Sequence, residues 1–340
     1  MTDAVIRVAA PSRLHFGMLA PVAPRAERET ASGVERTRKV DTSADELREF
    51  GGVGVMIEGG PTLRIESARE FTAAGPLADR AADFARRWSS FYGDVRLPPV
   101  RIRIQAAPPQ HVGLGVGTQL ALAVAAGLNA LFERPQPLAA ELAVSVGRAE
   151  RSAVGTYGFL MGGLIVERGK LPDERIAPLD CRLDLPEQWR FLLVRPERES
   201  GLCGEREKEA FAHLPQVSID VTERLAAEVR EHLLPAAAQG RFDDFSESVY
   251  QFGRLAGTCF AAHQGGPYNG PLLAEIVVAV RSLGIAGVGQ SSWGPTVFAL
   301  LPDASGYERL ASRLAERFRS EPVHVSLAAP DNRGARIARL

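Results

Sequence analysis

The sequence contains few cysteines and no long unbroken apolar run. Its 340 residues include three cysteines, Cys181, Cys203 and Cys259, which lie far apart and show neither C-x-x-C nor zinc-ligand spacing. An odd number of widely spaced cysteines argues against a disulfide framework and favours free thiols in a reducing compartment. No stretch approaches 18 uninterrupted apolar residues, and the N-terminus lacks a signal-peptide core. These absences predict a cytoplasmic protein with no membrane partner.

The sequence also lacks an excess of charge of either sign. Forty Lys and Arg oppose 41 Asp and Glu, for a formal net charge of -1, so no overall basic field would attract nucleic acid. The only lysines are Lys39, Lys170 and Lys208, and arginine, whose planar guanidinium suits phosphate and carboxylate, carries the remaining positive charge. We therefore expect no nucleic-acid partner and a local site for any anionic ligand.

What the sequence does contain is enough apolar material for about two domains. We expect a first domain at 1–185, with a polar insertion at 21–49 that forms a surface loop or lid, and a second domain at 186–340. Apolar patterning predicts strands at 5–9, 55–57, 62–66, 100–104, 164–167, 190–195, 296–301 and 323–327. It predicts helices at 76–92, from the glycine loop to about 132, and at 135–154, 205–212, 217–234, 240–262, 271–283 and 306–319.

Three polar or glycine-rich segments carry the functional signal. Ser12–Gly17 follows the first strand, Gly113–Gln119 leads into a buried Ala/Leu-rich helix, and residues 287–295 form a second glycine loop. Glycines that admit an anion to the unpaired amides of a helix N-terminus make a phosphate site. Taken alone, a glycine turn that packs a helix against a sheet explains the Gly113 loop equally well. Neither a Walker lysine nor the dinucleotide-binding glycine pattern is present.

As a set, these segments resemble the motifs of the GHMP small-molecule kinase superfamily. Ala10–Arg13, Pro109–Gly115 and residues 287–294 are similar to its first, second and third motifs, in that order and over essentially the whole chain. Three longer segments resemble those of one branch, the β-ribofuranosylaminobenzene 5'-phosphate synthase family. They are Ser12–Gly17, Gly113–Gln119 and Gly289–Thr296. The resemblance implies an α+β fold, with an N-terminal domain like domain 2 of ribosomal protein S5, a ferredoxin-like C-terminal domain and a cleft between them.

The resemblance also implies a reaction. Phosphoribosyl pyrophosphate would transfer ribose 5-phosphate to 4-hydroxybenzoate or 4-aminobenzoate, with loss of CO2 and pyrophosphate, on the pathway to tetrahydromethanopterin. It further implies Mg2+ as cofactor. Members of the superfamily are commonly homodimers, so the resemblance also suggests a homodimer. Kinases of the superfamily commonly carry a Ser-Gly-x-Asp element, but Val154–Tyr157 has no carboxylate here, and Gly117 replaces a serine that helps to hold magnesium. An ATP-dependent kinase and a non-catalytic phosphosugar-binding protein remain the alternatives.

This chemistry needs donors for the diphosphate, a cation for the benzoate carboxylate and an acceptor for a proton from the ring substituent. We expect Arg13 and His15 to be catalytic. No metal ligand is identified. The expected substrate-binding residues are Ser12, His111, Gly113, Gly115, Gly117, Thr118, Gln119, Arg148, Arg151, Gln290, Ser291, Ser292 and Trp293.

Several of these residues also admit an ordinary structural explanation. Arg13 fits an ion pair at the rim of a domain, and His15 fits a buried, hydrogen-bonded ring. Arg148 and Arg151 fit the solvated face of a helix, and Trp293 fits core packing. His111 caps a turn equally well, and the polar break His263–Asn269 is a further candidate wall of the cleft.

Overall fold

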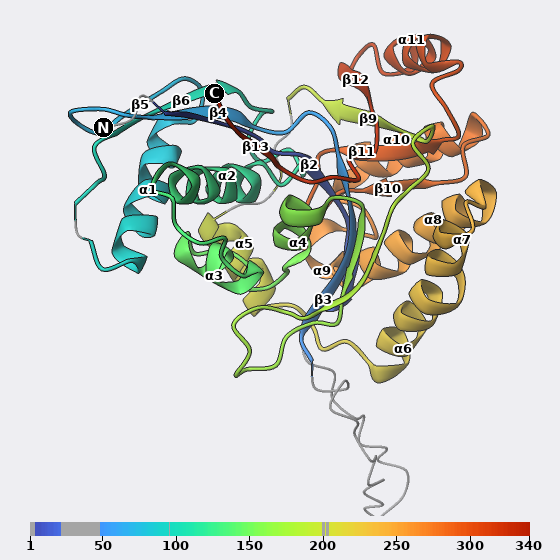
Figure 1. Cartoon of the computed structure of the whole chain (residues 1–340). Coiled ribbons are helices and arrows are strands. Elements are labelled where there is room, and N and C mark those ends of the chain that lie inside the picture. The colour runs from blue at the N-terminus through green and yellow to red at the C-terminus, as the bar shows by residue number, and fades with distance from the viewer. Residues whose placement is uncertain (1–3, 22–47, 95, 199–200, 202–203) are drawn as a thin grey trace, which may run out of the picture.

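The computed structural model describes residues 4–21, 48–94, 96–198, 201 and 204–340, so most of the predicted 21–49 insertion lies outside the described residues. Three sheets and the helices around them form the described part (Figure 1). The strands β1 (Val5–Ala9), β4 (Thr62–Ser67) and β6 (Val100–Ala106) form the centre of the first sheet, between β13 (Arg336–Arg339) at one edge and β5 (Thr72–Ala74) at the other.

One face of the first sheet is covered by α1 (Ala78–Phe91), α2 (Val116–Leu131) and α3 (Ala139–Ser145). The helix α2 is buried almost all round, as its Ala/Leu-rich sequence predicts. The other face carries exposed arginines: on β6, Ile102 and Ile104 are buried while Arg101 and Arg103 are exposed. This alternation confirms the predicted half-buried strand at 100–104.

The second sheet has the order β2 (Ser12–Ala20), β3 (Phe50–Ile57), β7 (Leu164–Glu167) and β8 (Leu179–Leu183). On one side of it lies α4 (Val154–Met161), and its opposite side shares a core with helices of the second half of the chain. Two short segments, Ala10–Pro11 and residues 58–61, connect strands of the first sheet directly to strands of the second. These two segments meet where the Ala10 N–H donates to Pro61 O at 2.9 Å.

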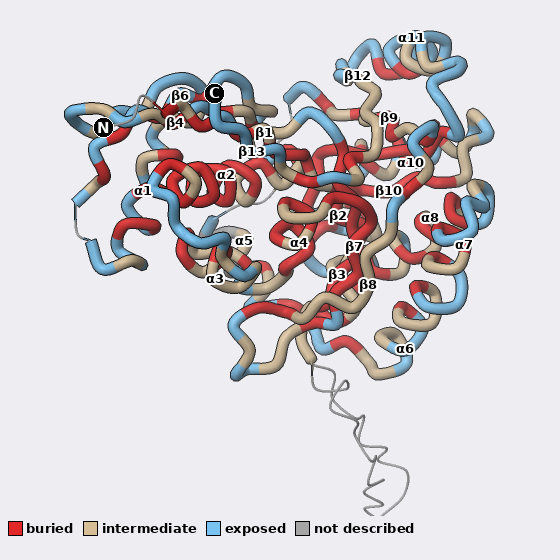
Figure 2. Tube along the Cα trace, in the orientation of Figure 1, coloured by how far each residue is buried: buried red, intermediate tan, exposed pale blue. Residues whose placement is uncertain are grey.

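The third sheet has the order β10 (Val288–Gln290), β11 (Val297–Leu301), β9 (Arg190–Pro196) and β12 (Val323–Ala328). Figure 2 shows the interior strands of the structure as largely buried. β11 is buried on both faces, with Phe298 and Leu300 in the core shared with the second sheet and Val297 and Ala299 in a separate core. The helices of this half are α5 (Gly204–Ala212), α6 (Ile219–Ala227), the π-helix η2 (Glu228–Leu233), α7 (Leu234–Ala238), α8 (Phe242–Thr258), α9 (Ala261–Gln264), α10 (Gly270–Ser282) and α11 (Tyr307–Arg317).

The helix predicted over 135–154 is wrong. α3 ends at Ser145 because Gly147 and Ala149 both adopt left-handed backbone angles, with φ of 65° and 61°. Arg148 and Arg151 therefore lie in an irregular segment and not on a solvated helix face. Gly155 and Gly158 lie inside α4, although glycine is more common where a helix is interrupted.

Two further differences concern strands. Ser12–Gly17 follows the end of β1, as predicted, but it is itself the start of a second strand, β2, because the chain changes sheet at Pro11. The strand near 323–327 is not the last: β13 pairs with β1, and its four exposed residues carry no apolar signal. β8 and β9 belong to different sheets on either side of the predicted boundary at 185, which remains a prediction.

We predict that Gly60→Ala destabilises the protein where Ala10–Pro11 and residues 58–61 meet. A Cβ at Gly60 would lie 2.1 Å from the backbone oxygen of Pro11, and such a clash can be relieved only by moving backbone, at a cost of about 1–3 kcal/mol. Thermal and urea unfolding measure the loss. Gly253→Ala in α8 is the control, because its Cβ would make an ordinary 3.5 Å contact with Phe16 O; equal stability of the two variants would contradict the prediction.

Candidate active site

The three predicted motifs meet at the side chain of Ser291. Its hydroxyl accepts a hydrogen bond from the His15 N–H at 3.0 Å and donates one to Gly113 O at 2.7 Å. The Arg13 N–H donates to Leu114 O at 3.0 Å, and the Ser292 N–H donates to His15 O at 3.1 Å. β2, the Gly113 loop and the 287–295 loop therefore form one hydrogen-bonded unit, although 276 residues separate His15 from Ser291.

The N-terminus of α2 has the form of an anion site. Its N-cap, Gly115, has φ of 67°, and no side chain caps the helix, so the partial positive charge of the first turn is not neutralised there. The side chain of Arg13 lies against Gly115, where a Cβ would stand 3.2 Å from Arg13 Nε. Arg80, on α1, similarly approaches Gly117, with Nη2 at 2.8 Å from the position of a Cβ.

Further arginines gather around this helix end. Burial, followed by the charges of Arg80 and Arg87, lowers the pKa of Arg148 to about 10. Burial and then Arg80 also lower the pKa of His111. Cations crowded around Arg148 are unfavourable unless an anion lies among them. The Nε atoms of Arg13 and Arg148 are buried without a hydrogen-bond partner among the described residues, so both can serve a ligand.

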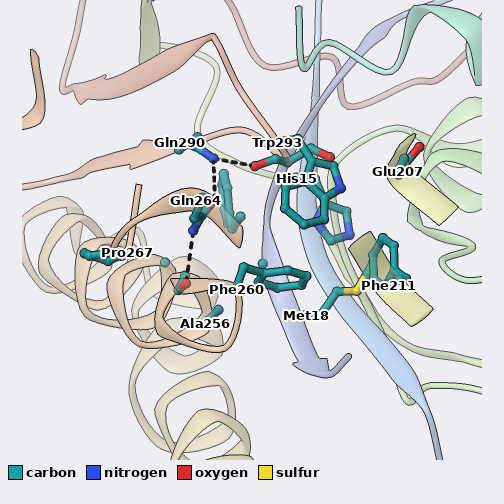
Figure 3. Close-up of a pocket in the computed structure, with 15 residues that line it drawn as sticks. His15, Met18, Glu207, Phe211, Ala256, Phe260, Gln264, Pro267, Gln290 and Trp293 are labelled. Atoms are coloured by element: carbon teal, nitrogen blue, oxygen red, sulfur yellow. Dashed lines mark hydrogen bonds between the residues drawn. The ribbon is translucent and has the colours of Figure 1, made fainter. Parts of the chain in front are cut away.

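A cavity lies beside this anion site (Figure 3). Trp293 packs edge-on against Phe211 of α5 and against Phe260, with ring centroids 5.7 and 5.0 Å apart. Met18 of β2 and Ala256 of α8 add further apolar wall. Such a lining accepts a flat aromatic ring.

The polar lining of the cavity is sparse and unevenly placed. Figure 3 shows Glu207 and Phe211 at one end and Gln264 with Gln290 at the other, while His15 lies between. No lysine or arginine is among the described lining residues. The charge of Glu207 partly offsets the lowering, mainly by burial, of the pKa values of Arg13, His111 and Arg148. The end that carries Glu207 therefore faces the anion site.

Arg151 lies at this same end of the cavity. Its guanidinium carbon is 4.2 Å from the centroid of the Phe211 ring, and Nη2 is 3.4 Å from Oε1 of Glu207. Its Nη1 is buried without a partner among the described residues. Arg151 does not itself line the cavity, but it contacts Phe211 and Glu207, which do, and its Nη1 remains available as a donor.

Behind His15 lies a buried carboxyl group that the sequence did not point to. Glu167, at the end of β7, is 0% exposed, and His15 is 4% exposed. The pKa of Glu167 is raised to about 8 by burial, against the smaller effects of the nearby Ser152 hydroxyl, the Ala153 amide and Arg13. The pKa of His15 is lowered to about 3 by burial and then by the charge of Arg13. Both side chains are therefore mainly uncharged near neutral pH.

The structure brings most of the predicted site residues together. Arg13, His15, Gly113, Gly115, Gly117, His111, Arg148, Arg151, Ser291, Ser292 and Trp293 surround the anion site and the cavity. Gln290 also lines the cavity, where it accepts from the Asn269 N–H and donates to Ser292 O. Ser12 and Gln119 instead make internal hydrogen bonds: the Ser12 hydroxyl donates to Gly59 O, and Gln119 Nε2 donates to Gly155 O. Thr118 lies against Gly155. The individual roles of all these residues remain predictions.

Sequence reasoning missed Arg80, Arg87, Glu167, Glu207, Phe211 and Phe260. The seven-residue spacing of Arg80 and Arg87 on a predicted helix was a usable signal, because it places both on one face. Gly52 and Gly54 inside a strand were another, since glycine there marks the close approach of other groups. Nothing local distinguishes Glu207 or Phe211, which reach the site only through the packing of α5.

The described residues contain neither a metal-ligand cluster nor a membrane-spanning helix. Among them, no group of three or more His, Cys, Asp or Glu side chains stands ready to hold a metal ion. None of the helices in the described ranges is long and apolar enough to cross a membrane.

Comparison with known proteins defines the class of fold. The family described as GHMP kinases N terminal domain matches residues 77–163, and GHMP kinases C terminal matches residues 233–320. The galactokinase of Lactococcus lactis, solved with galactose, superposes with a TM-score of 0.67 at 12% identity, over 98% of this chain and 95% of that one. A putative homoserine kinase from Listeria monocytogenes gives 0.65 at 14% identity, over 98% and 100%. The chain thus has the two-domain α+β fold of the GHMP kinases.

Sequence relatives narrow the class. The beta-ribofuranosylphenol 5'-phosphate synthase of Methanothermobacter thermautotrophicus is 30% identical over 320 residues, which cover 87% of this chain and 94% of the relative. The synthase of the same name from Archaeoglobus fulgidus is 26% identical over 322 residues, 90% and 91% of the two chains. The chain belongs to the family of these synthases, which are enzymes with the GHMP kinase fold.

We predict that Glu167 makes the free energy of unfolding fall between pH 6.5 and 8. Its pKa is about 8 in the folded protein and 4.5 ordinarily, so the folded state holds an extra proton in this interval and rising pH favours unfolding. His15 contributes the opposite slope only between about pH 3 and 6.5. The fall should amount to at most about 2 kcal/mol.

Urea unfolding at several pH values tests this slope. In Glu167→Gln the fall between pH 6.5 and 8 should disappear. Glu66→Gln, which removes an exposed carboxylate paired with Arg101, should retain it. A slope that survives in Glu167→Gln would show that another group is responsible.

Proposed function

We propose that this chain catalyses the reaction for which its relatives are named, the formation of β-ribofuranosylphenol 5'-phosphate. The substrates would be phosphoribosyl pyrophosphate and 4-hydroxybenzoate, and the other products CO2 and pyrophosphate. The printed names of the relatives contain phenol, and a phenol product follows from 4-hydroxybenzoate, whereas 4-aminobenzoate would give an aminobenzene. The product would lead to tetrahydromethanopterin. The observation that carries the proposal is an arginine-rich anion site that opens beside an aromatic-walled cavity.

The diphosphate would bind at the N-terminus of α2. Cleavage of the bond between the ribose carbon and the diphosphate oxygen leaves a cationic sugar and adds negative charge to the leaving group. The helix amides, Arg13 and Arg148 offer donors to that charge, and Gly115 and Gly117 leave room for phosphate oxygens to approach. An anion there would also relieve the repulsion between Arg148 and its neighbours Arg80 and Arg87.

The aromatic acid would lie in the cavity between Trp293, Phe211 and Phe260. Its carboxylate would face Arg151, because the described cavity lining contains no lysine or arginine and the unpartnered Nη1 of Arg151 lies at the Glu207 end. That orientation directs the carboxylate-bearing carbon, which attacks the ribose, toward the anion site. The ring substituent would then point into the interior of the cavity.

His15 would receive the proton that the ring substituent loses as the new carbon–carbon bond forms. It lines the cavity and is uncharged near neutral pH, so it has capacity to accept. Arg13, two residues earlier on β2, would act on the diphosphate side. Loss of CO2 returns the bonding electrons to the ring and restores its aromaticity.

Mg2+ would enter with the diphosphate. Mg2+ commonly binds through one or two carboxylates together with substrate phosphates and water, and it would neutralise charge on the leaving group. This mode needs no preformed cluster of ligands, and none occurs among the described residues. Glu207 is the carboxylate of the described cavity lining, at the end that faces the anion site.

Incubation of the protein with Mg2+, phosphoribosyl pyrophosphate and 4-hydroxybenzoate tests the proposal. The expected result is equal release of CO2 and pyrophosphate with formation of a C-riboside. ATP turnover with a small alcohol would instead indicate a kinase, although the first turn of α4, Val154–Tyr157, supplies no carboxylate as a base. Binding of the phosphosugar without turnover of either kind would indicate a binding protein.

We predict that Arg148→Met and Trp293→Leu separate the two substrates. Arg148→Met keeps an unbranched apolar side chain but removes the guanidinium, whose carbon lies 5.0 Å from the centroid of the Phe84 ring. The KM for phosphoribosyl pyrophosphate should therefore rise about 10- to 100-fold. Trp293→Leu removes an aromatic wall, so the KM for 4-hydroxybenzoate should rise about tenfold. Steady-state kinetics with each substrate varied in turn give both constants.

Arg86→Met is the matched control for the loss of one positive charge, because Arg86 is exposed on α1 and pairs with Asp83. Its kinetic constants should equal those of the unaltered protein. The assignment of separate subsites would be contradicted if each variant raised the KM for both substrates. It would also be contradicted if neither variant raised either KM.

A further inference from the structure

Glu167 and His15 face each other across a space that two glycines leave open. On β3, Gly54 pairs with His15 of β2, and Gly52 pairs with Glu167 of β7. A Cβ at Gly52 would lie 2.9 Å from both Oε1 of Glu167 and Nε2 of His15. Any larger residue at 52 would therefore separate these two atoms. A bulge in β2 between His15 and Gly17 changes the local direction of the strand at this position.

One oxygen of the Glu167 carboxyl group accepts a hydrogen bond, and the other accepts none. Oε2 of Glu167 accepts the Ala153 N–H at 2.6 Å, at the N-terminus of α4. Oε1 is buried and has no hydrogen-bond partner among the described residues. The Ser152 hydroxyl lies 3.3 Å from His15 Nε2. A fully buried acceptor without a partner is costly, so a role for it is expected.

We propose that Glu167 is the positioning residue of His15, and that one proton moves between them through the Ser152 hydroxyl during the reaction. The inference rests on the proposed function. Oε1 of Glu167 makes no hydrogen bond to His15, but the Ser152 hydroxyl lies 3.3 Å from His15 Nε2 and also interacts with Glu167, whose pKa it lowers. His15 itself lines the cavity, so it connects the ring substituent to this pair. A carboxylate behind a histidine fixes its tautomer and stabilises the imidazolium that forms.

In the proposed step, one proton leaves the substituent oxygen and later returns to it, so the step is balanced. As the ring carbon bonds to the ribose carbon, the carbon–oxygen bond to diphosphate breaks with its electron pair. The substituent O–H proton then passes to His15, the proton on Nε2 passes to the Ser152 hydroxyl, and the hydroxyl proton passes to ionised Glu167. When CO2 leaves, the electrons of its carbon–carbon bond return to the ring, and the proton returns to the substituent oxygen by the same route. Neither oxidant nor reductant is needed.

The active form of the pair has Glu167 ionised before the substituent is deprotonated. Arg13 on β2 and Tyr157 on α4 are the other charged or titratable groups that interact with Glu167, and Glu207 of α5 acts through Arg13. Because Glu167 holds its proton up to about pH 8, activity should increase as the pH rises to that value. The midpoint belongs to the coupled pair and not to one residue.

The pH dependence of kcat/KM in Glu167→Gln tests the proposal. In the unaltered protein, kcat/KM should rise about tenfold per pH unit below pH 8 and level off above it. Glu167→Gln keeps an oxygen that can accept the Ala153 N–H, so it should fold, but its activity should be about 100-fold lower at pH 8.5 and independent of pH. Glu167→Asp should restore part of the activity together with the rise. The control Glu66→Gln should match the unaltered protein.

Nitrogen NMR of the free protein gives a second readout that does not depend on turnover. The ring signals of His15, assigned by their loss in His15→Asn, should shift with a midpoint near pH 8 and remain constant in Glu167→Gln. An unchanged rise of kcat/KM in Glu167→Gln, or the same NMR shift in that variant, would overturn the inference. Failure of the proposed function is distinguishable, because the unaltered protein would then form no C-riboside at any pH.

Discussion

The site depends on one hydroxyl group. Ser291 accepts from the backbone of β2 and donates to the backbone of the Gly113 loop, so it joins segments from both ends of the chain to the start of α2. Each of these segments carries part of the proposed chemistry: Arg13 and His15 on β2, the uncapped helix end at Gly115, and Trp293 beside Ser291. Together with the backbone hydrogen bonds from Arg13 to Leu114 and from Ser292 to His15, this connection fixes the relative position of the anion site and the cavity.

Two opposite electrostatic environments lie side by side around this junction. At the end of α2, burial and the charges of Arg80 and Arg87 lower the pKa of Arg148, and this crowding of cations favours a highly charged ligand. Two residues from Arg13 along β2, His15 is buried and mainly uncharged near neutral pH, as is Glu167 of β7. This contrast suits the proposed reaction, in which a diphosphate leaves on one side while an aromatic ring rearranges on the other. A site built for kinase chemistry would instead need a carboxylate in the first turn of α4, where Val154–Tyr157 has none.

The sequence predicted the elements with strong periodicity and missed those without it. β1 and β7 have the predicted bounds, and α2 is buried as its composition indicates. The predicted helix at 135–154 fails because the periodicity of 139–145 was extended through Gly147, whose backbone has a positive φ. β13 was missed because an exposed edge strand stabilised by pairing with β1 shows no apolar alternation.

The sequence by itself determined the motifs, because glycines beside a buried helix and the order of three polar segments are local features. It therefore placed Arg13, His15 and the Gly113 loop in one site and indicated the family. Only the tertiary structure decided which other residues join them: Arg80 comes from α1, Phe211 and Glu207 from α5, and Glu167 from β7. Their positions follow from how sheets and helices pack, and a burial or an electrostatic contact between distant segments leaves no mark on the sequence around either residue.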